Sequence, residues 1–206
     1  MTLTRERPKT RSQSMNYIVY RPNSVILYPG RAGAVCRVQS GLIRLHIIDN
    51  AGNSLTLRYV KPGEFFGEEA LAGLERQHFA ESVVESVVEM FDVSLVTPQT
   101  AMLLNMGLAA ALNQSYVQIA RLALKRLRSR MAAALLELSD TAVGGRSADG
   151  GLQVFATHDE LAAAVGSVRE TVTKVIGELV RDGLIDSGYG KITLRDIEGL
   201  RTVALE

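Results

Sequence analysis

The residue pattern of this chain changes abruptly at Pro98. Before Pro98, glycines and prolines separate short stretches rich in β-branched residues, whereas Ala, Leu, Met, Arg and Gln dominate after it. Short strands joined by frequent turns are typical of an antiparallel barrel or roll, and the second composition is typical of helices. We therefore predict an α+β chain whose N-terminal antiparallel β-roll occupies residues 15–97.

Within this half, two segments predict a β-hairpin. Residues 41–48 alternate partly between apolar and polar side chains, residues 49–53 carry a turn signal, and residues 54–60 alternate clearly. Residues 81–93 predict a third strand region. The single cysteine, Cys36, excludes an internal disulfide and a cysteine-held iron–sulfur cluster, and its apolar neighbours favour a place in the core.

Residues 98–128 predict one long helix with two apolar stripes. The first stripe recurs at spacings of three and four and comprises Met102, Met106, Ala109, Asn113, Tyr116, Ala120, Ala123 and Leu127. The second stripe comprises Leu108, Leu112, Ile119 and Leu122. Because the β-roll can cover only one face, we expect a second copy of the chain to cover the other, which makes this a dimerisation helix. The alternative is a helix buried inside one monomer. Gly107 indicates either the helix start or a bend.

The segments that flank these elements predict a tail and a hinge. Residues 1–14 mix four cations with Thr, Ser and Pro and predict a mobile tail, for which DNA contact stays open. Residues 129–143 predict a helix followed by a hinge. Residues 144–151 are rich in glycine and predict a flexible loop at a domain boundary, so that the C-terminal domain spans residues 144–206.

The C-terminal domain carries the pattern of a winged helix-turn-helix. Thr157 and Glu160 predict a capping box, Gly166 predicts a tight turn, and Ser167 with Glu170 predicts a second capping box. Two short β-prone segments around residues 187–190 predict a two-stranded wing. The exposed side of the second helix would carry Arg169, Glu170, Thr173 and Lys174.

These side chains suit base recognition. Arginine can bind guanine O6 and N7 with two hydrogen bonds, and glutamate can accept a hydrogen bond from cytosine N4. The alternative is an ordinary solvated face of an amphipathic helix. Residues 157–206 contain six Lys plus Arg and nine Asp plus Glu, so DNA affinity must depend on individually placed contacts rather than on bulk charge.

Two segments resemble the CRP/FNR family of bacterial transcription regulators. Gly166-Ser-Val-Arg-Glu-Thr-Val-Thr-Lys174 is similar to its recognition-helix motif, and Lys61-Pro-Gly-Glu-Phe-Phe-Gly-Glu-Glu-Ala-Leu71 is similar to its β-roll signature. The resemblance implies a cyclic-nucleotide-binding-like β-roll, a homodimer, a palindromic double-stranded DNA site with TGTGA-type half-sites, and contact between an activator and RNA polymerase through the loop at Val143–Gly151. An activator and a repressor that only occludes promoters are not separated by the sequence.

The resemblance also assigns DNA-contacting residues. Arg169 and Glu170 match the base-reading pair, while Lys174 replaces a third base-reading arginine. Val168 replaces a serine of the family and so removes a polar contact. The remaining candidates for DNA contact are Thr157, Ser167, Thr171, Thr173 and Lys191.

The effector region departs from the family pattern. Members that bind cyclic AMP hold its phosphate with an arginine–serine pair, and that pair falls at His78 and Phe79 here. Glu68 matches the family's ribose contact, so this residue of the pattern is retained. Many other carboxylates lie nearby in the sequence, and Arg76 is the only cation among them. We therefore expect a degenerate pocket and a regulator that does not need cyclic AMP; gating by cyclic AMP or by another small molecule is the alternative. The pocket would comprise Gly67, Glu68, His78, Phe79 and Tyr116.

Other function classes are not supported. The three histidines are far apart, and no His-x-His pair, nucleophile elbow or P-loop occurs, so we expect neither an enzyme nor a bound metal or cofactor. No apolar run is long enough to span a membrane, and the N-terminus lacks a secretory signal, so we expect a cytoplasmic protein.

Overall fold

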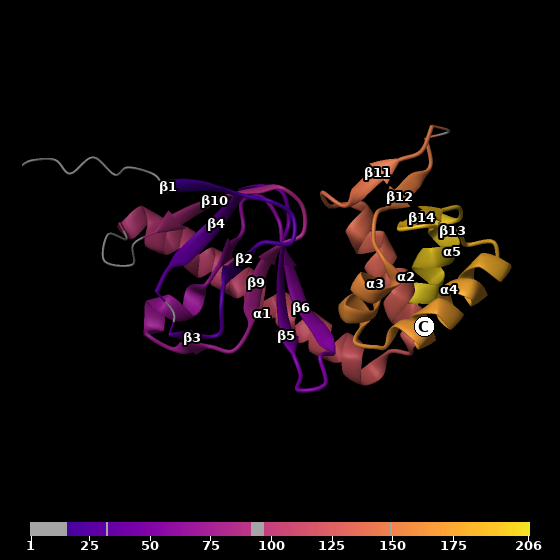
Figure 1. The fold of residues 1–206 in the computed structure, drawn as a ribbon, viewed down its shortest axis with the longest axis horizontal. Coiled ribbons are helices and arrows are strands. Elements are labelled where there is room, and N and C mark those ends of the chain that lie inside the picture. Colours follow the sequence, from indigo (N-terminus) through magenta and orange to yellow (C-terminus); the bar gives the residue numbers. More distant parts are fainter. Residues whose placement is uncertain (1–15, 32, 92–96, 149) are drawn as a thin grey trace, which may run out of the picture.

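The computed structural model of the protein describes residues 16–31, 33–91, 97–148 and 150–206. A β-roll and a C-terminal unit of helices and short strands lie at opposite ends of the molecule, and helix α1 (Pro98–Leu124) runs from one toward the other (Figure 1). This arrangement confirms the predicted α+β architecture. The predicted tail at residues 1–14 lies outside the described residues.

The β-roll consists of two four-stranded antiparallel sheets, with strand orders β1-β10-β4-β7 and β2-β9-β5-β6, and of a short pair, β3-β8. Cys36, Val38, Ile43, Phe66 and Val88 are fully buried in its core. The strands are β1 (Asn16–Tyr20), β2 (Val25–Leu27), β3 (Gly30–Arg31), β4 (Val35–Ser40), β5 (Ile43–Ile48), β6 (Ser54–Val60), β7 (Phe65–Phe66), β8 (Glu75–Arg76), β9 (Phe79–Ser82) and β10 (Ser86–Phe91). A 3-10 helix, η1 (Glu68–Ala72), follows β7.

The predicted hairpin is confirmed, and strand β10 lies within the strand region expected at residues 81–93, whose first two residues belong to β9. β5 pairs with β6 across the turn that follows Ile48. Between β9 and β10 the chain leaves one sheet and enters the other. The Ser86 hydroxyl accepts a hydrogen bond from the Leu42 backbone N–H and donates to the Val84 carbonyl, and this holds the crossing in place.

Helix α1 ends earlier than the expected boundary at residue 128. Lys125 and Arg126 adopt extended backbone angles, and α2 (Leu127–Ser139) then starts in a new direction. Gly107 is neither a start nor a break in the helix. A Cβ atom at Gly107 would lie 3.1 Å from Phe65 Cδ2, so the glycine allows the β-roll to approach the helix closely.

One face of α1 carries exposed apolar side chains. Only Leu104 is fully buried on this helix. The exposed apolar residues are Met102, Leu103, Met106, Leu108, Leu112, Tyr116, Val117, Ile119 and Leu124. The single chain therefore does not bury both predicted stripes.

The C-terminal unit contains more sheet than expected. Gly144–Arg146, predicted as part of a flexible loop, is strand β11, and it pairs with β12 (Leu152–Val154). β12 also pairs with β14 (Lys191–Leu194), which extends the predicted two-stranded wing of β13 (Ile185–Gly188) and β14 to a four-stranded sheet. Helices α3 (His158–Val165), α4 (Arg169–Arg181) and α5 (Ile197–Leu205) complete the unit.

Candidate nucleic-acid interface and effector region

The first helix of the helix-turn-helix begins at a complete capping box. The Thr157 hydroxyl accepts a hydrogen bond from the Glu160 backbone N–H at 3.2 Å, and Glu160 Oε2 accepts one from the Thr157 backbone N–H at 2.6 Å. The helix ends at Gly166, whose φ is +62°. A Cβ atom there would lie 2.7 Å from Leu122 Cδ2. Glycine is therefore favoured at this position both by the positive φ and by the close approach of Leu122.

The predicted second capping box is absent. The N-cap of α4 is Val168, which has no side-chain oxygen to accept a hydrogen bond from the helix. Ser167 lies one residue earlier, in the turn, where its backbone N–H donates to the Ala162 carbonyl at 3.0 Å. Ser167 therefore belongs to the turn between the helices, and α4 begins without a side-chain cap.

Helix α4 separates its apolar and polar faces sharply. Val172, Val175, Ile176 and Leu179 are buried against the rest of the unit. The exposed side presents Arg169, Glu170, Thr171, Thr173 and Lys174, which are the residues predicted to face DNA. Lys191 is also exposed, at the start of β14.

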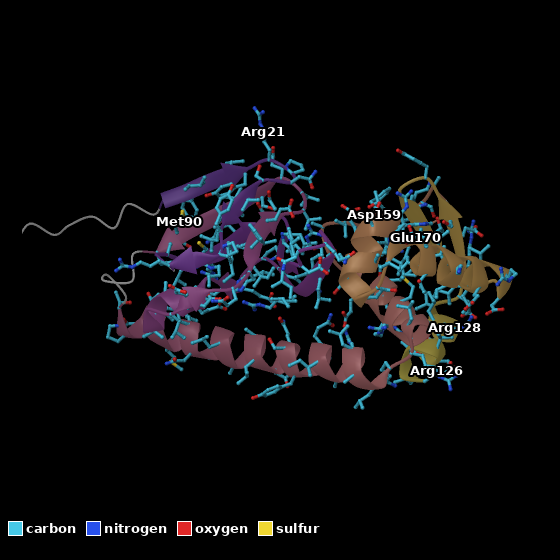
Figure 2. All side chains as sticks on the ribbon, turned by 60° about the horizontal axis from the view of Figure 1, so that its bottom comes forward. Arg21, Met90, Arg126, Arg128, Asp159 and Glu170 are labelled. Carbon is cyan, nitrogen blue, oxygen red and sulfur yellow. The ribbon has the colours of Figure 1, made fainter. Side chains whose placement is uncertain are left out.

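Polar contacts between α3 and α4 orient part of this surface. Arg169 Nη1 lies 3.2 Å from Asp159 Oδ2, and both side chains are about two-thirds exposed, at 64% and 65%. The Thr173 hydroxyl donates to the Arg169 carbonyl and lies 2.9 Å from His158 Nδ1. Figure 2 shows Asp159 and Glu170 at the same corner of the unit. An exposed ion pair contributes little stability, so the Arg169 side chain can leave Asp159 at low cost.

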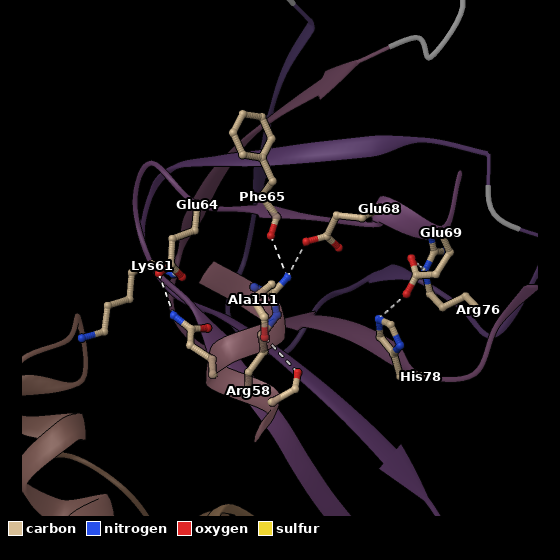
Figure 3. Close-up of polar contacts among 11 residues, drawn as sticks. Arg58, Lys61, Glu64, Phe65, Glu68, Glu69, Arg76, His78 and Ala111 are labelled. Atoms are coloured by element: carbon tan, nitrogen blue, oxygen red, sulfur yellow. Dashed lines mark hydrogen bonds and ion pairs between the residues drawn. The ribbon is translucent and has the colours of Figure 1, made fainter. Parts of the chain in front are cut away.

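Buried ion pairs occupy the predicted effector region. Arg58 reaches from β6 and donates one hydrogen bond to Glu68 Oε1 at 2.7 Å and another to the Phe65 carbonyl at 2.8 Å (Figure 3). The Arg58 and Glu68 side chains are only 10% and 12% exposed. Arg76 is thus not the only cation here, because the hairpin brings Arg58 to Glu68 although ten residues separate them in the sequence. Burial raises the pKa of Glu68.

A second group of charges lies beside the first. Arg76, which is 3% exposed, has its Nε 3.6 Å from Glu69 Oε2, and His78 Nε2 lies 3.5 Å from Glu69 Oε1 (Figure 3). Burial lowers the pKa of His78. Gly67, with φ of +82°, lies so close to the residue before β4 that a Cβ atom would be 2.6 Å from the Ala34 carbonyl oxygen.

The remaining pocket residues do not join this group. Phe79 stacks on His46, with ring centroids 5.4 Å apart, and meets the edge of Tyr28 at 6.0 Å. Tyr116 is 60% exposed on α1 and forms no hydrogen bond or ring contact with them among the described residues. Sequence reasoning missed Arg58 and His46, because alternation along β6 places Arg58 on the face opposite its apolar residues Leu55, Leu57 and Tyr59.

Metal-ligating side chains do not gather anywhere in the ranges that the structure describes. Within those ranges, no group of three or more His, Cys, Asp or Glu side chains is placed to hold a metal ion. Over the same part of the chain, no helix is long and apolar enough to cross a bilayer.

Known proteins resemble this chain along most of its length. The profile of the cyclic nucleotide-binding domain matches residues 17–96, and that of the Crp-like helix-turn-helix domain matches residues 129–203. The transcriptional regulator SdrP of Thermus thermophilus is 50% identical over 196 residues, which cover 94% of this chain and 96% of the relative. The Cyclic AMP receptor protein of the same species is 31% identical over 195 residues, with 90% and 87% covered. A crystal structure of a CRP/FNR-family transcriptional regulator from Thermus thermophilus, 50% identical, superposes with a TM-score of 0.89 over 93% of this chain and 99% of that chain.

Proposed function

Because the chain belongs to the CRP/FNR family of DNA-binding transcriptional regulators, we propose that it binds palindromic DNA as a homodimer and activates transcription in the cytoplasm without cyclic AMP. The observation that carries the cyclic AMP part of the proposal is the buried Arg58–Glu68 pair. The exposed side of α4 supports the DNA part.

The dimer is supported by the apolar face of α1. Methionines, leucines and aromatic or β-branched residues stay exposed along this helix, as in a helix that packs against its own copy. Sedimentation at increasing protein concentration tests it, with Ile119→Glu as the variant, because Ile119 is 62% exposed on that face. The wild type should sediment as a dimer and the variant as a monomer that keeps its helical circular dichroism. A monomeric wild type contradicts the proposal.

Independence from cyclic AMP follows from how Glu68 is engaged. The carboxylate that matches the family's ribose contact already accepts a hydrogen bond from Arg58, and His78 and Phe79 replace the family's phosphate-holding arginine and serine in an ungapped count from Gly67. Isothermal titration with cyclic AMP should give no binding heat, and operator affinity should not change when the nucleotide is added. Tight binding would instead support gating by cyclic AMP, the ligand in the name of one relative.

Activation is proposed from the position of the segment before the DNA-binding helices. β11 and the turn that follows it extend from the C-terminal unit and could touch RNA polymerase bound next to the operator (Figure 1). In vitro transcription with purified polymerase should show stimulation at a promoter that carries the operator. A protein that only represses would give no stimulation at any promoter.

The operator can be found by selecting bound sequences from a random DNA pool. We expect two TGTGA-like half-sites in inverted orientation, about one helical turn apart from centre to centre. Because residues 157–206 carry more carboxylates than cations, binding to random DNA should be weak and its salt dependence modest. A steep salt dependence on random DNA would show that bulk charge carries the affinity.

A further inference from the structure

We propose that the cleft between the β-roll and the C-terminal unit binds a small organic acid that carries one carboxylate and a separate hydrogen-bond donor. The inference deepens the proposed function, on which it rests, because it places an effector of the regulator in the cleft between the two units, beside the predicted nucleotide pocket, with which the cleft shares Arg58. The cleft has a volume of about 270 Å³, and its walls come from β6, α1, α2 and α3.

The cleft lies where the two units meet. Gln118 on α1 points its amide nitrogen at the Thr56 carbonyl of β6 and the Ala164 carbonyl of α3, at 3.4 and 3.5 Å. The Lys61 ammonium on the β-roll side lies 3.8 Å from Asp140 Oδ2, just after α2. A molecule bound between these walls would touch both the sensor-like roll and the DNA-binding unit.

Arg130 supplies an unused cation in this cleft. It lies on α2, is partly buried, and has its Nε shielded from solvent without a hydrogen-bond partner. Among the described residues, no carboxylate forms an ion pair with it. A buried guanidinium N–H without a partner is costly, and a carboxylate is the ligand group that matches its geometry.

Gln114 supplies an unused acceptor on the opposite wall. Its amide nitrogen donates to Glu64 Oε1 at 3.1 Å, which fixes the direction of the amide group. Its Oε1 is buried and has no donor among the described residues. A hydroxyl or ammonium group on the ligand would satisfy this oxygen.

The other charged groups around the cleft limit the ligand to one negative charge. Arg58 is paired with Glu68, Arg121 with Glu137, and Lys61 with Asp140. Arg130 therefore remains the one charge along the described cleft wall without a counter-ion. A dianion such as a phosphate monoester would bring a charge that no free cation balances.

A matched series of compounds tests this ligand class in the full-length protein. L-lactate carries the carboxylate and a hydroxyl, propionate lacks the hydroxyl, and lactamide lacks the charge; larger 2-hydroxy and 2-amino acids extend the series to fill the cleft. In thermal unfolding, the hydroxy or amino acids should raise the midpoint more than propionate, and lactamide should have no effect. If no acid of the series raises the midpoint above an equal concentration of sodium chloride, the proposal is overturned.

Variants locate the binding and keep the test independent of the ligand's identity. Arg130→Met should weaken binding of the responding acid by roughly 10–100-fold, and Gln114→Leu should make hydroxy acids no better than propionate. Without ligand, Arg130→Met should unfold at the same or a higher temperature, because it removes a partly buried group without a partner. A lower midpoint would show that Arg130 stabilises the fold itself and would overturn the proposal.

A final control separates this inference from the proposed function. Operator binding by Arg130→Met in the absence of ligand should equal that of the wild type, since Arg130 lies on α2 rather than on α4. If the acids do not raise the unfolding midpoint while the wild type still binds the operator, the cleft inference is wrong and the proposed function is unaffected. If the wild type binds no operator at all, the proposed function itself fails.

Discussion

The exposed face of α4 and the region around Glu68 use their charged residues in opposite ways. On α4, Arg169 and Lys174 are exposed, and the one ion pair of Arg169 among the described residues is open to solvent. In the β-roll, Arg58 and Arg76 are buried beside carboxylates of the same chain. An exposed cation is available to a partner, whereas a buried and paired one contributes to folding. The cations on α4 are therefore open to another molecule, whereas those around Glu68 are engaged inside the β-roll.

The largest expected effect tests whether the β-roll charges are structural. Arg58→Met leaves the buried Glu68 carboxylate without its counter-ion and should lower the free energy of unfolding by about 3–5 kcal/mol, measured in urea. The matched control is Arg201→Met, because Arg201 is paired with Glu198 at 2.7 Å but is 63% exposed. That change should have little effect. If both variants lost the same unfolding free energy, the Arg58–Glu68 pair would be no more important to folding than an exposed ion pair.

The next effect tests whether the α4 charges serve DNA. Arg169→Ala should weaken operator binding by roughly 1–3 kcal/mol per half-site and relax specificity at one G·C pair, with stability almost unchanged. Fluorescence anisotropy on operator and random DNA measures both quantities. Arg181→Ala, at the far end of α4, serves as the control. Equal weakening on the two DNAs would mean that Arg169 contacts phosphate alone.

A smaller effect concerns the capping box at the start of α3. Thr157→Ala removes the oxygen that accepts from the Glu160 backbone N–H and should cost about 1 kcal/mol in unfolding free energy. Thr157→Ser keeps the oxygen and should restore most of the stability. If the alanine variant loses operator affinity while its stability is unchanged, Thr157 acts on the DNA backbone rather than on the helix.

The smallest expected effect is a pH dependence of stability that arises in the β-roll. Burial lowers the pKa of His46 and of His78, so the unfolded chain binds more protons than the folded chain once the pH falls below the unfolded value of about 6.5. Stability should therefore decrease as the pH is lowered from about 7 to about 6. Urea unfolding at several pH values in this range should show that the unfolding free energy of His78→Gln changes less with pH than that of the wild type. An unchanged pH dependence would remove His78 from the explanation.

Local sequence patterns predicted the parts of the fold that depend on neighbouring residues. Thr157 and Glu160 interact within one helical turn, so their spacing was enough to predict the capping box. The exposed face of α4 followed from its periodicity in the same way. Ser167 failed as a cap because the turn that begins at Gly166 extends one residue further than the spacing suggested.

Features that depend on distant residues could not be predicted. Gly144–Arg146 has the composition of a loop and becomes a strand because β12 offers it a partner, which in turn pairs with β14. Arg58 reaches Glu68 because β6 and η1 meet in the roll, a contact that a count along the motif does not reveal. The cleft beside Arg130 needs four elements at once, so no single segment of sequence indicates it.

The break between α1 and α2 has a geometric consequence for operator choice. The 27 helical residues of α1 make a rod roughly 40 Å long, and the two extended residues Lys125 and Arg126 form an elbow at its end. In the proposed homodimer, each rod carries one recognition helix, and the two helices must enter major grooves about 34 Å apart. These two residues would therefore set the distance between the two recognition helices. Inserting or deleting a residue there would change the spacing of half-sites that the dimer accepts, while the bases read within each half-site would stay the same.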